Sequence, residues 1–64
     1  MIVLTRLNQR AFVLNAELIK MIEATPDTLV TLVNGDCVMV REAIDEVVEK
    51  VVDYQRRIHG FSVV

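Results

Sequence analysis

The stretch TLVNGDCVMVRE, residues 31–42, places an Asn-Gly pair between two apolar runs. Asn34-Gly35 is the pair preferred in two-residue hairpin loops of type I′, which need a positive φ at both positions. The stretch therefore predicts two antiparallel strands, at 28–33 and 36–40, joined by a tight turn.

Cross-strand partners share a face of a sheet, so this turn also assigns each side chain to one of two faces. One face is wholly apolar and is the expected seat of a helix. The other is expected to point outward, and it is also mostly apolar, although an exposed sheet face normally alternates to polar residues. The inward face carries Val30, Leu32, Cys37 and Met39, and the outward face carries Leu29, Thr31, Val33, Asp36, Val38 and Val40.

Two further strand signals precede this hairpin. IVLTRL and RAFVLN flank Asn8-Gln9 and predict a first hairpin, although Gln9 fits a positive φ less well than glycine and allows a longer loop. A third run, LIKMIEA at 18–24, follows a short connection at 15–17 and is closed by the turn residues TPDT at 25–28. Short links make consecutive strands antiparallel neighbours. The sequence thus predicts an α+β fold with an antiparallel meander of four to five strands.

The C-terminal segment changes to a helical period from about 42 to 58. At 100° per residue, its apolar side chains fall on one stripe and its charged side chains on the opposite side. We expect one amphipathic helix on the sheet, with Gly60 as its stop. The expected single domain covers 1–60, and the tail 61–64 stays unassigned. The apolar stripe is Ile44, Val47, Val48, Val51, Val52, Tyr54 and Ile58.

The composition limits the functions open to the chain. Its net charge is -2 over 64 residues, with no basic stripe to neutralise nucleic-acid phosphates. No apolar run approaches the roughly 20 residues of a spanning helix, so a cytoplasmic location without a transmembrane segment is expected. A chain of this size buries only about 60% of its unfolded surface. Its single cysteine cannot form an internal disulfide, so association is expected to supply the missing core.

Several residues are of types that are common in active sites, but they have simpler structural interpretations. Cys37 is expected to be a core cysteine on the inward face, not a nucleophile. His59 has no Asp or Cys partner at a useful spacing and is expected to complement the helix end. The helix carboxylates Glu42, Asp45, Glu49 and Asp53 are expected to form a solvated face, not a cation site. No catalytic, cofactor-binding or metal-ligating residue is predicted.

Gln55 interrupts the apolar stripe of the helix. It lies either in water past the edge of the sheet or hydrogen-bonded to a partner chain.

A homo-oligomer is expected, because a helix about 10 Å wide covers only one face of the sheet and leaves the outward face bare. The hypothetical interaction residues are Leu29, Thr31, Val33, Val38, Val40 and Gln55.

The segments LTRLN, FVLNAELI, IEATPDT, TLVNG and VVEKV closely resemble the pattern of the FlbD/SwrD family of small bacterial flagellar proteins. The resemblance extends to about residue 58 and departs at Gln9, where Gly is expected, and at Ala43, where Ser is expected. It implies a non-enzymatic accessory protein that supports motility, in some members by raising motor power for swarming, at or near the flagellar base. Flagellar motor or export components are then alternative partners for the outward face.

Two other classes of protein remain as alternatives. A DNA-binding module similar to LytTR also places short strands before a helix and has an I-x-x-I-E rhythm, but it would need a basic face. A small enzyme would need a paired acid, base or nucleophile. The sequence therefore favours a protein that works by binding other proteins.

Overall fold

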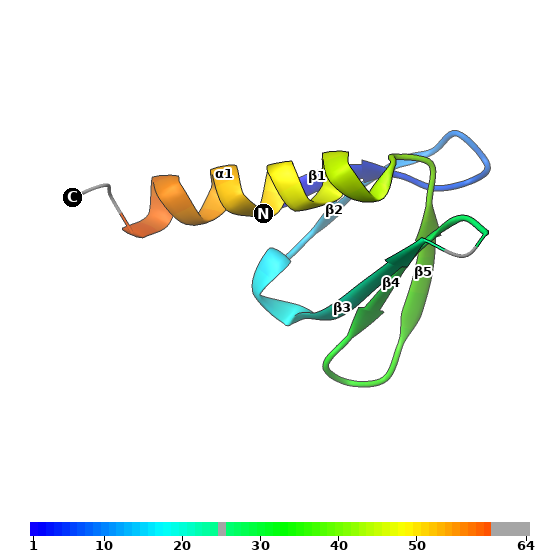
Figure 1. The fold of residues 1–64 in the computed structure, drawn as a ribbon, viewed down its shortest axis with the longest axis horizontal. Coiled ribbons are helices and arrows are strands. Elements are labelled where there is room, and N and C mark those ends of the chain that lie inside the picture. Colours follow the sequence, from blue (N-terminus) through cyan, green and yellow to red (C-terminus); the bar gives the residue numbers. More distant parts are fainter. Residues whose placement is uncertain (25, 60–64) are drawn as a thin grey trace.

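The computed structural model describes residues 1–24 and 26–59. In that part of the chain, five strands precede one helix, every strand pair is antiparallel, and the strands form two sheets (Figure 1). The predicted α+β fold with a C-terminal helix is confirmed. The strands are β1 (Ile2–Thr5), β2 (Ala11–Leu14), β3 (Ile19–Ala24), β4 (Thr28–Leu32) and β5 (Cys37–Val40), and the helix is α1 (Ile44–His59). Expectations that lie outside the described residues concern Thr25, Gly60, 61–64 and the side chains of Ile58 and His59.

The first hairpin, β1–β2, closes with a three-residue loop. The Gln9 N–H donates to the Arg6 carbonyl at 2.9 Å, and the Arg6 N–H donates to the Arg10 carbonyl at 2.8 Å. The Asn8 side chain accepts a hydrogen bond from the Arg10 N–H at 3.0 Å. Gln9 has a φ of 75°, which fits a type I turn followed by one left-handed residue. The chain thus adopts the longer loop that Gln9 allows.

The second hairpin, β4–β5, closes with the same loop instead of the predicted two-residue turn. The Gly35 N–H donates to the Leu32 carbonyl at 2.9 Å, and the Leu32 N–H donates to the Asp36 carbonyl at 2.8 Å. The Asn34 side chain accepts from the Asp36 N–H at 2.9 Å. In this loop only Gly35 has a positive φ, 97°, whereas a type I′ turn needs one at Asn34 as well.

The longer loop shifts β5 by one residue relative to β4. Val30 pairs with Val38, where the two-residue turn would have paired it with Met39. Because successive residues of a strand point to opposite faces, this shift exchanges the two faces of β5. The prediction that Cys37 and Met39 point inward while Val38 and Val40 point outward is therefore wrong.

The two sheets meet at one corner and then diverge. Arg6, just after β1, forms an isolated antiparallel bridge with Val40 at the end of β5. Between β2 and β3 the chain makes a short 3-10 turn, whose first free N–H, that of Glu17, donates to the Asn15 side chain at 3.1 Å. The strands therefore follow the predicted hairpin order, but the meander is broken between β2 and β3.

Helix α1 begins later than the predicted position 42. The Val47 N–H donates to the Ala43 carbonyl at 3.1 Å, which makes Ala43 the residue that precedes and caps the helix. Alanine has no side-chain oxygen to accept from the free N–H groups of the first turn. The Glu46 carboxylate does accept from the Ala43 N–H at 3.1 Å, so half of a capping box is present.

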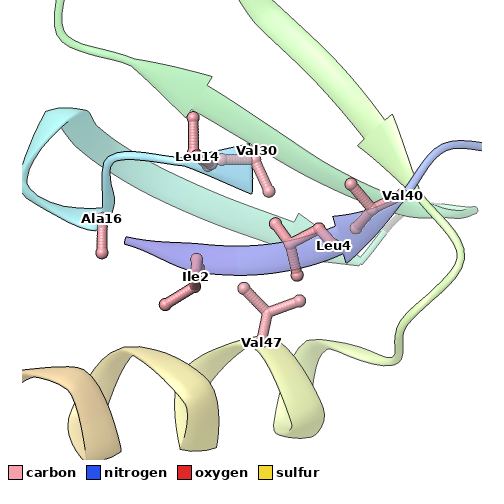
Figure 2. Packing of buried hydrophobic residues seen from close by; sticks show 7 residues of the cluster. All are labelled: Ile2, Leu4, Leu14, Ala16, Val30, Val40 and Val47. Carbon is pink, nitrogen blue, oxygen red and sulfur yellow. The ribbon is translucent and has the colours of Figure 1, made fainter. Parts of the chain in front are cut away.

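The core lies where the inner faces of both sheets meet the helix (Figure 2). Val47 of α1 points toward Ile2 and Leu4 of β1, while Val30 and Val40 close the core from the three-stranded sheet. The helix contacts β1 and β3. The first hairpin covers the inner face of β4–β5, where the sequence analysis placed the helix. The buried apolar residues are Ile2, Leu4, Leu14, Ala16, Val30, Val40 and Val47.

The helix buries only part of its apolar stripe. Val47 is fully buried, and Val51 and Tyr54 are partly buried against the core. Val48 and Val52 remain exposed, because they lie on the flank of the helix away from β1.

Candidate interaction surfaces

The three-stranded sheet has an uncovered face, which we call the outer sheet face. Across it, Met21 pairs with Thr31 and Thr31 with Cys37, and in the next row Glu23 pairs with Leu29 and Leu29 with Met39. Cross-strand partners share a face, so these six side chains lie together. The two rows are mostly apolar, yet Met21 and Met39 are 45% and 41% exposed. An uncovered apolar sheet face was the basis of the predicted association, and the structure contains one with a changed membership.

The change in membership follows from the one-residue shift of β5. Val38 is partly buried against the core and Val40 is 1% exposed, so both lie on the inner face of the sheet and not on the outer sheet face. Cys37, Met39 and Met21 take their places on the surface.

The expectation that Cys37 is a core residue is wrong, because its side chain is exposed. Its Sγ lies 3.7 Å from the Thr31 hydroxyl and 3.8 Å from the Gly35 carbonyl oxygen, both within hydrogen-bond reach of sulfur. These contacts place the thiol at the end of the outer sheet face.

The remaining predicted interaction residues do not form one surface. Leu29 and Thr31 lie on the central strand of the outer sheet face and are half-buried by their neighbours. Val33 lies in the loop and is 62% exposed. Gln55 is exposed on the helix, where both water and a partner chain could reach it.

A second apolar surface, whose residues the sequence analysis did not name, lies on β1–β2 and is called here the outer hairpin face. Val3 and Val13 are cross-strand partners, 53% and 64% exposed, and Met1 beside them is 66% exposed. A hollow of about 250 Å³ adjoins Met1 and Val3, and it is lined on the helix side by charged residues. The available signal was the period of two along a strand. Because Ile2 and Leu4 point inward, Val3 between them points outward. The charged residues of the hollow are Lys50, Asp53 and Arg57.

A polar junction ties the end of β1 to the start of the helix. The Thr5 N–H and hydroxyl donate to the two carboxylate oxygens of Glu42 at 3.0 and 2.8 Å. The Arg41 N–H donates to the Thr5 carbonyl at 2.8 Å. Burial works to raise the pKa of Glu42, but the bonds from Thr5, its own backbone N–H and the charge of Lys50 outweigh it and lower the pKa. Glu42 is therefore a structural anchor and not a residue of the solvated helix face.

A second polar contact joins the helix to the 3-10 turn. The Tyr54 hydroxyl donates to the Glu17 carboxylate at 3.2 Å. Desolvation, the negative charge of Glu17 and this hydrogen bond together raise the pKa of Tyr54. The contact positions the middle of the helix, and it offers no acid-base pair at neutral pH because the phenol stays protonated.

Another hollow among the described residues holds a cation–π contact. A hollow of about 390 Å³ lies between β2 and the β4–β5 loop, where the Arg6 guanidinium stacks 4.4 Å from the centre of the Phe12 ring. Within residues 1–24 and 26–59, no three His, Cys, Asp or Glu side chains gather closely enough to hold a metal ion. The same described part contains no helix with the length and apolar character needed to cross a membrane.

The fold and its surfaces define the class: a small α+β protein with two uncovered apolar sheet faces. The family described as flagellar and swarming motility proteins, FlbD, matches residues 1–59. The match covers nearly the whole chain, and the chain therefore belongs to the FlbD family, as the resemblance indicated. No curated protein and no solved structure matches it.

Proposed function

We propose that the protein is a non-enzymatic accessory of the flagellum that supports swarming by raising motor power through contact with another flagellar protein. The observation that carries this proposal is the family match over residues 1–59. The two uncovered apolar faces support a binding role, because soluble proteins rarely expose contiguous apolar patches without a partner. The protein acts in the cytoplasm at the flagellar base, on a motor or export component, and needs no cofactor or nucleic acid.

The outer hairpin face is the surface we assign to the flagellar partner. Val3 and Val13 form an exposed cross-strand pair, and the hollow beside Val3 is lined by Lys50 and by Asp53 and Arg57, which form an ion pair at 3.5 Å. The apolar pair together with the positive charge of Lys50 suits a partner segment that carries apolar and acidic side chains.

Deletion of the gene in a flagellated bacterium that carries it tests the function. Filament number, swarm expansion on soft agar and the torque of tethered cells are measured together. We expect filaments at wild-type number, with swarming and torque reduced. Cells that make no filaments would show an assembly role instead, and cells that swarm normally would refute the proposal.

A matched pair of variants tests the surface in the same strain. Val13→Lys adds a charge to the outer hairpin face, while Val33→Lys adds the same charge at a loop position of equal exposure, 64% against 62%. We expect Val13→Lys to behave like the deletion and Val33→Lys to restore swarming, with both proteins folded by circular dichroism. The reverse pattern would remove the outer hairpin face from the proposal.

A further inference from the structure

Strand β2 has a free edge. In the part of the chain that the structure describes, its one strand neighbour is β1. The 2.8 Å bond from the Arg6 N–H to the Arg10 carbonyl makes these two residues a hydrogen-bonded pair of the hairpin. Along an antiparallel ladder, such pairs alternate with pairs whose backbone groups point away from each other. The N–H and C=O groups of Ala11 and Val13 therefore point away from β1.

The other side of the same hairpin follows this alternation. Thr5 is the cross-strand partner of Ala11, and its backbone groups point away from β2. Its N–H donates to Glu42, and its carbonyl accepts from Arg41. On the β2 side, no group among residues 1–24 and 26–59 bonds the outward groups of Ala11 and Val13. The edge thus presents two donors and two acceptors at a regular spacing.

This edge also lacks the features by which edge strands avoid further pairing. Those features are charged side chains, proline and bulges. Strand β3 has two of them, because Lys20 and Glu23 are charged and its register shifts near its start. Strand β2 reads AFVL and has a regular register. Strand β2 therefore remains open to a further strand.

A hollow of about 390 Å³ follows the free edge of β2. It is lined by Phe12 and Leu14, which share the inner side of the hairpin with Leu4 and Ile2, and by Val13 on the outer side. Side chains from both faces of a strand meet one hollow at the edge of that strand. The opposite wall belongs to the β4–β5 hairpin and is partly apolar. Its apolar members include Leu32 and Val38.

We infer that the flagellar partner adds an extended segment to β2 as a further antiparallel strand, with alternate apolar side chains in this hollow. The inference rests on the proposed function and adds the form in which the partner binds the outer hairpin face. In this pairing, residues opposite Phe12 and Leu14 enter the hollow, and the residue opposite Val13 lies on the outer hairpin face. Backbone bonds supply affinity in such strand addition, and alternate side chains supply specificity.

Two arginines set the direction of the added strand. Arg6 and Arg10 are cross-strand partners at the loop end of the hairpin, on the same side as Phe12. Both are exposed, and the ion pair found among the described residues lies on the helix, away from them. The acid on the opposite wall, Asp36, is bonded by the Asn34 side chain at 3.1 Å. An antiparallel segment with an acidic residue at its C-terminal end, opposite Arg10, complements this charge.

A second copy of the chain suits this edge less well than a single extended segment. Two copies paired through β2 and centred on Phe12 would place Arg10 opposite Leu14 of the other copy. Both arginines would then lie without an acid. Each copy would also bring its own β4–β5 hairpin to the edge, where the hollow already has one such wall. The occupant is therefore a segment of another protein.

A designed probe tests the inference by NMR. The probe is the capped peptide Ser-Val-Thr-Leu-Thr-Glu, whose Val, Leu and Glu lie opposite Leu14, Phe12 and Arg10. Titration should shift the Ala11 and Val13 amides with a Kd on the order of 1 mM or below. Their hydrogen exchange should slow by about tenfold at saturation. No binding at about 5 mM probe, or shifts centred on another surface, would overturn the inference.

Methylation of the probe's amides separates strand addition from contact by side chains alone. The two threonines of the probe lie opposite Ala11 and Val13 and exchange backbone bonds with them, so N-methylation of both should weaken binding by about tenfold or more. N-methylation of the Val and Leu amides, which point away from β2, should change Kd by no more than about threefold. Equal binding by the two methylated probes would count against strand addition and overturn the inference.

Variants of the protein test the same edge. Val13→Pro removes the outward N–H and leaves the bonds to β1, whereas Val13→Thr keeps that N–H at the same position. The first should lose the probe, and the second should bind it within about threefold of the wild type. Arg10→Glu should weaken binding by about threefold, and a probe with Lys in place of Glu should restore it. Folded Val13→Pro protein that binds normally, or Arg10→Glu protein that binds both probes equally, would refute the pairing.

Two further outcomes separate this inference from the proposed function. If protection of the Ala11 and Val13 amides rises with protein concentration in the absence of probe, a second copy occupies the edge, and the inference is overturned while the proposed function stands. If the probe binds as expected and the deletion strain swarms normally, the strand site stands and the proposed function fails.

Discussion

Exchanging the residue types at the left-handed positions of the two hairpin loops should change stability in opposite directions. Gln9 and Gly35 occupy equivalent positions, with φ of 75° and 97°. A side chain in the left-handed region costs about 1–2 kcal/mol, and the extra freedom of glycine in the unfolded chain offsets about 0.4–1 kcal/mol of that. Gln9→Gly should therefore stabilise the protein by about 0.5–1 kcal/mol, and Gly35→Gln should destabilise it by about the same or slightly more.

The surroundings of Gly35 make this estimate unusually direct. A Cβ placed there would meet no heavy atom within 4 Å, so steric conflict adds nothing to the backbone term. The φ of Gly35 lies further from the left-handed minimum near 57° than that of Gln9, which makes the loss at Gly35 the larger of the two effects.

Urea unfolding followed by circular dichroism measures both changes, at about 10 µM so that association does not contribute. With a slope of about 1 kcal/mol per molar urea, each midpoint should move by roughly 0.5–1 M, and each melting temperature by about 2–8 °C. The double variant should lie near the wild type, because the loops are separate and their effects add. Midpoints that move in the same direction, or a loss above about 3 kcal/mol for Gly35→Gln, would refute the assignment of one loop type to both hairpins.

Three further predictions concern the helix start and the core. Ala43→Ser should complete the capping box and raise the free energy of unfolding by about 1 kcal/mol in the same urea assay; no gain would show that the position does not cap the helix. Glu42 has a lowered pKa in the folded protein, so its stabilisation is present above its ordinary value near 4.5 and disappears as the pH falls through the folded value. Glu42→Gln should destabilise the protein at pH 7 by about 1 kcal/mol, since it weakens the bonds from Thr5. In a plot of melting temperature against pH, the variant should show a smaller fall at acid pH than the wild type. Leu4→Ala should cost about 2–5 kcal/mol because Leu4 is fully enclosed, whereas Val3→Ala on the same strand should stay within about 0.5 kcal/mol; similar losses in both would contradict the assignment of faces in β1.

The sequence predicted the elements well because each has a local cause. Apolar runs bounded by turn residues marked every strand, and the 3.6-residue period marked the helix, so fold class and element order followed from neighbours in the chain. The start of the helix was placed too early because Glu42 continues the charged pattern. In the structure the Glu42 carboxylate accepts hydrogen bonds from Thr5, 37 residues away, and the helix starts after Glu42.

The composition of the candidate surface could not be predicted in the same way. Asn34-Gly35 allows both a two-residue and a three-residue loop, and the two differ by one residue in register. The first hairpin held the missing signal, because RLNQR and LVNGD share the asparagine and the chain length of one loop type. Gln9 makes a turn with two positive φ values costly, so the pattern with one left-handed residue fits both loops.

Contacts distant in the sequence favour the register that the structure adopts. Val40 bridges Arg6, the Arg41 N–H donates to the Thr5 carbonyl, and Glu42 accepts from Thr5, so the end of β5 is fixed against β1 by three consecutive residues. These contacts hold Val40 inside the core. With Val40 fixed inward, the alternation of β5 puts Cys37 and Met39 outside. The contacts of Val40, Arg41 and Glu42 with β1 thus also determine which side chains lie on the outer sheet face. Thr5→Val removes the hydroxyl bond of this junction. We therefore expect β5 to slip toward the register of the two-residue turn, which would bury Cys37. Thiol reactivity that rises or stays constant in that variant would show that the loop alone sets the register.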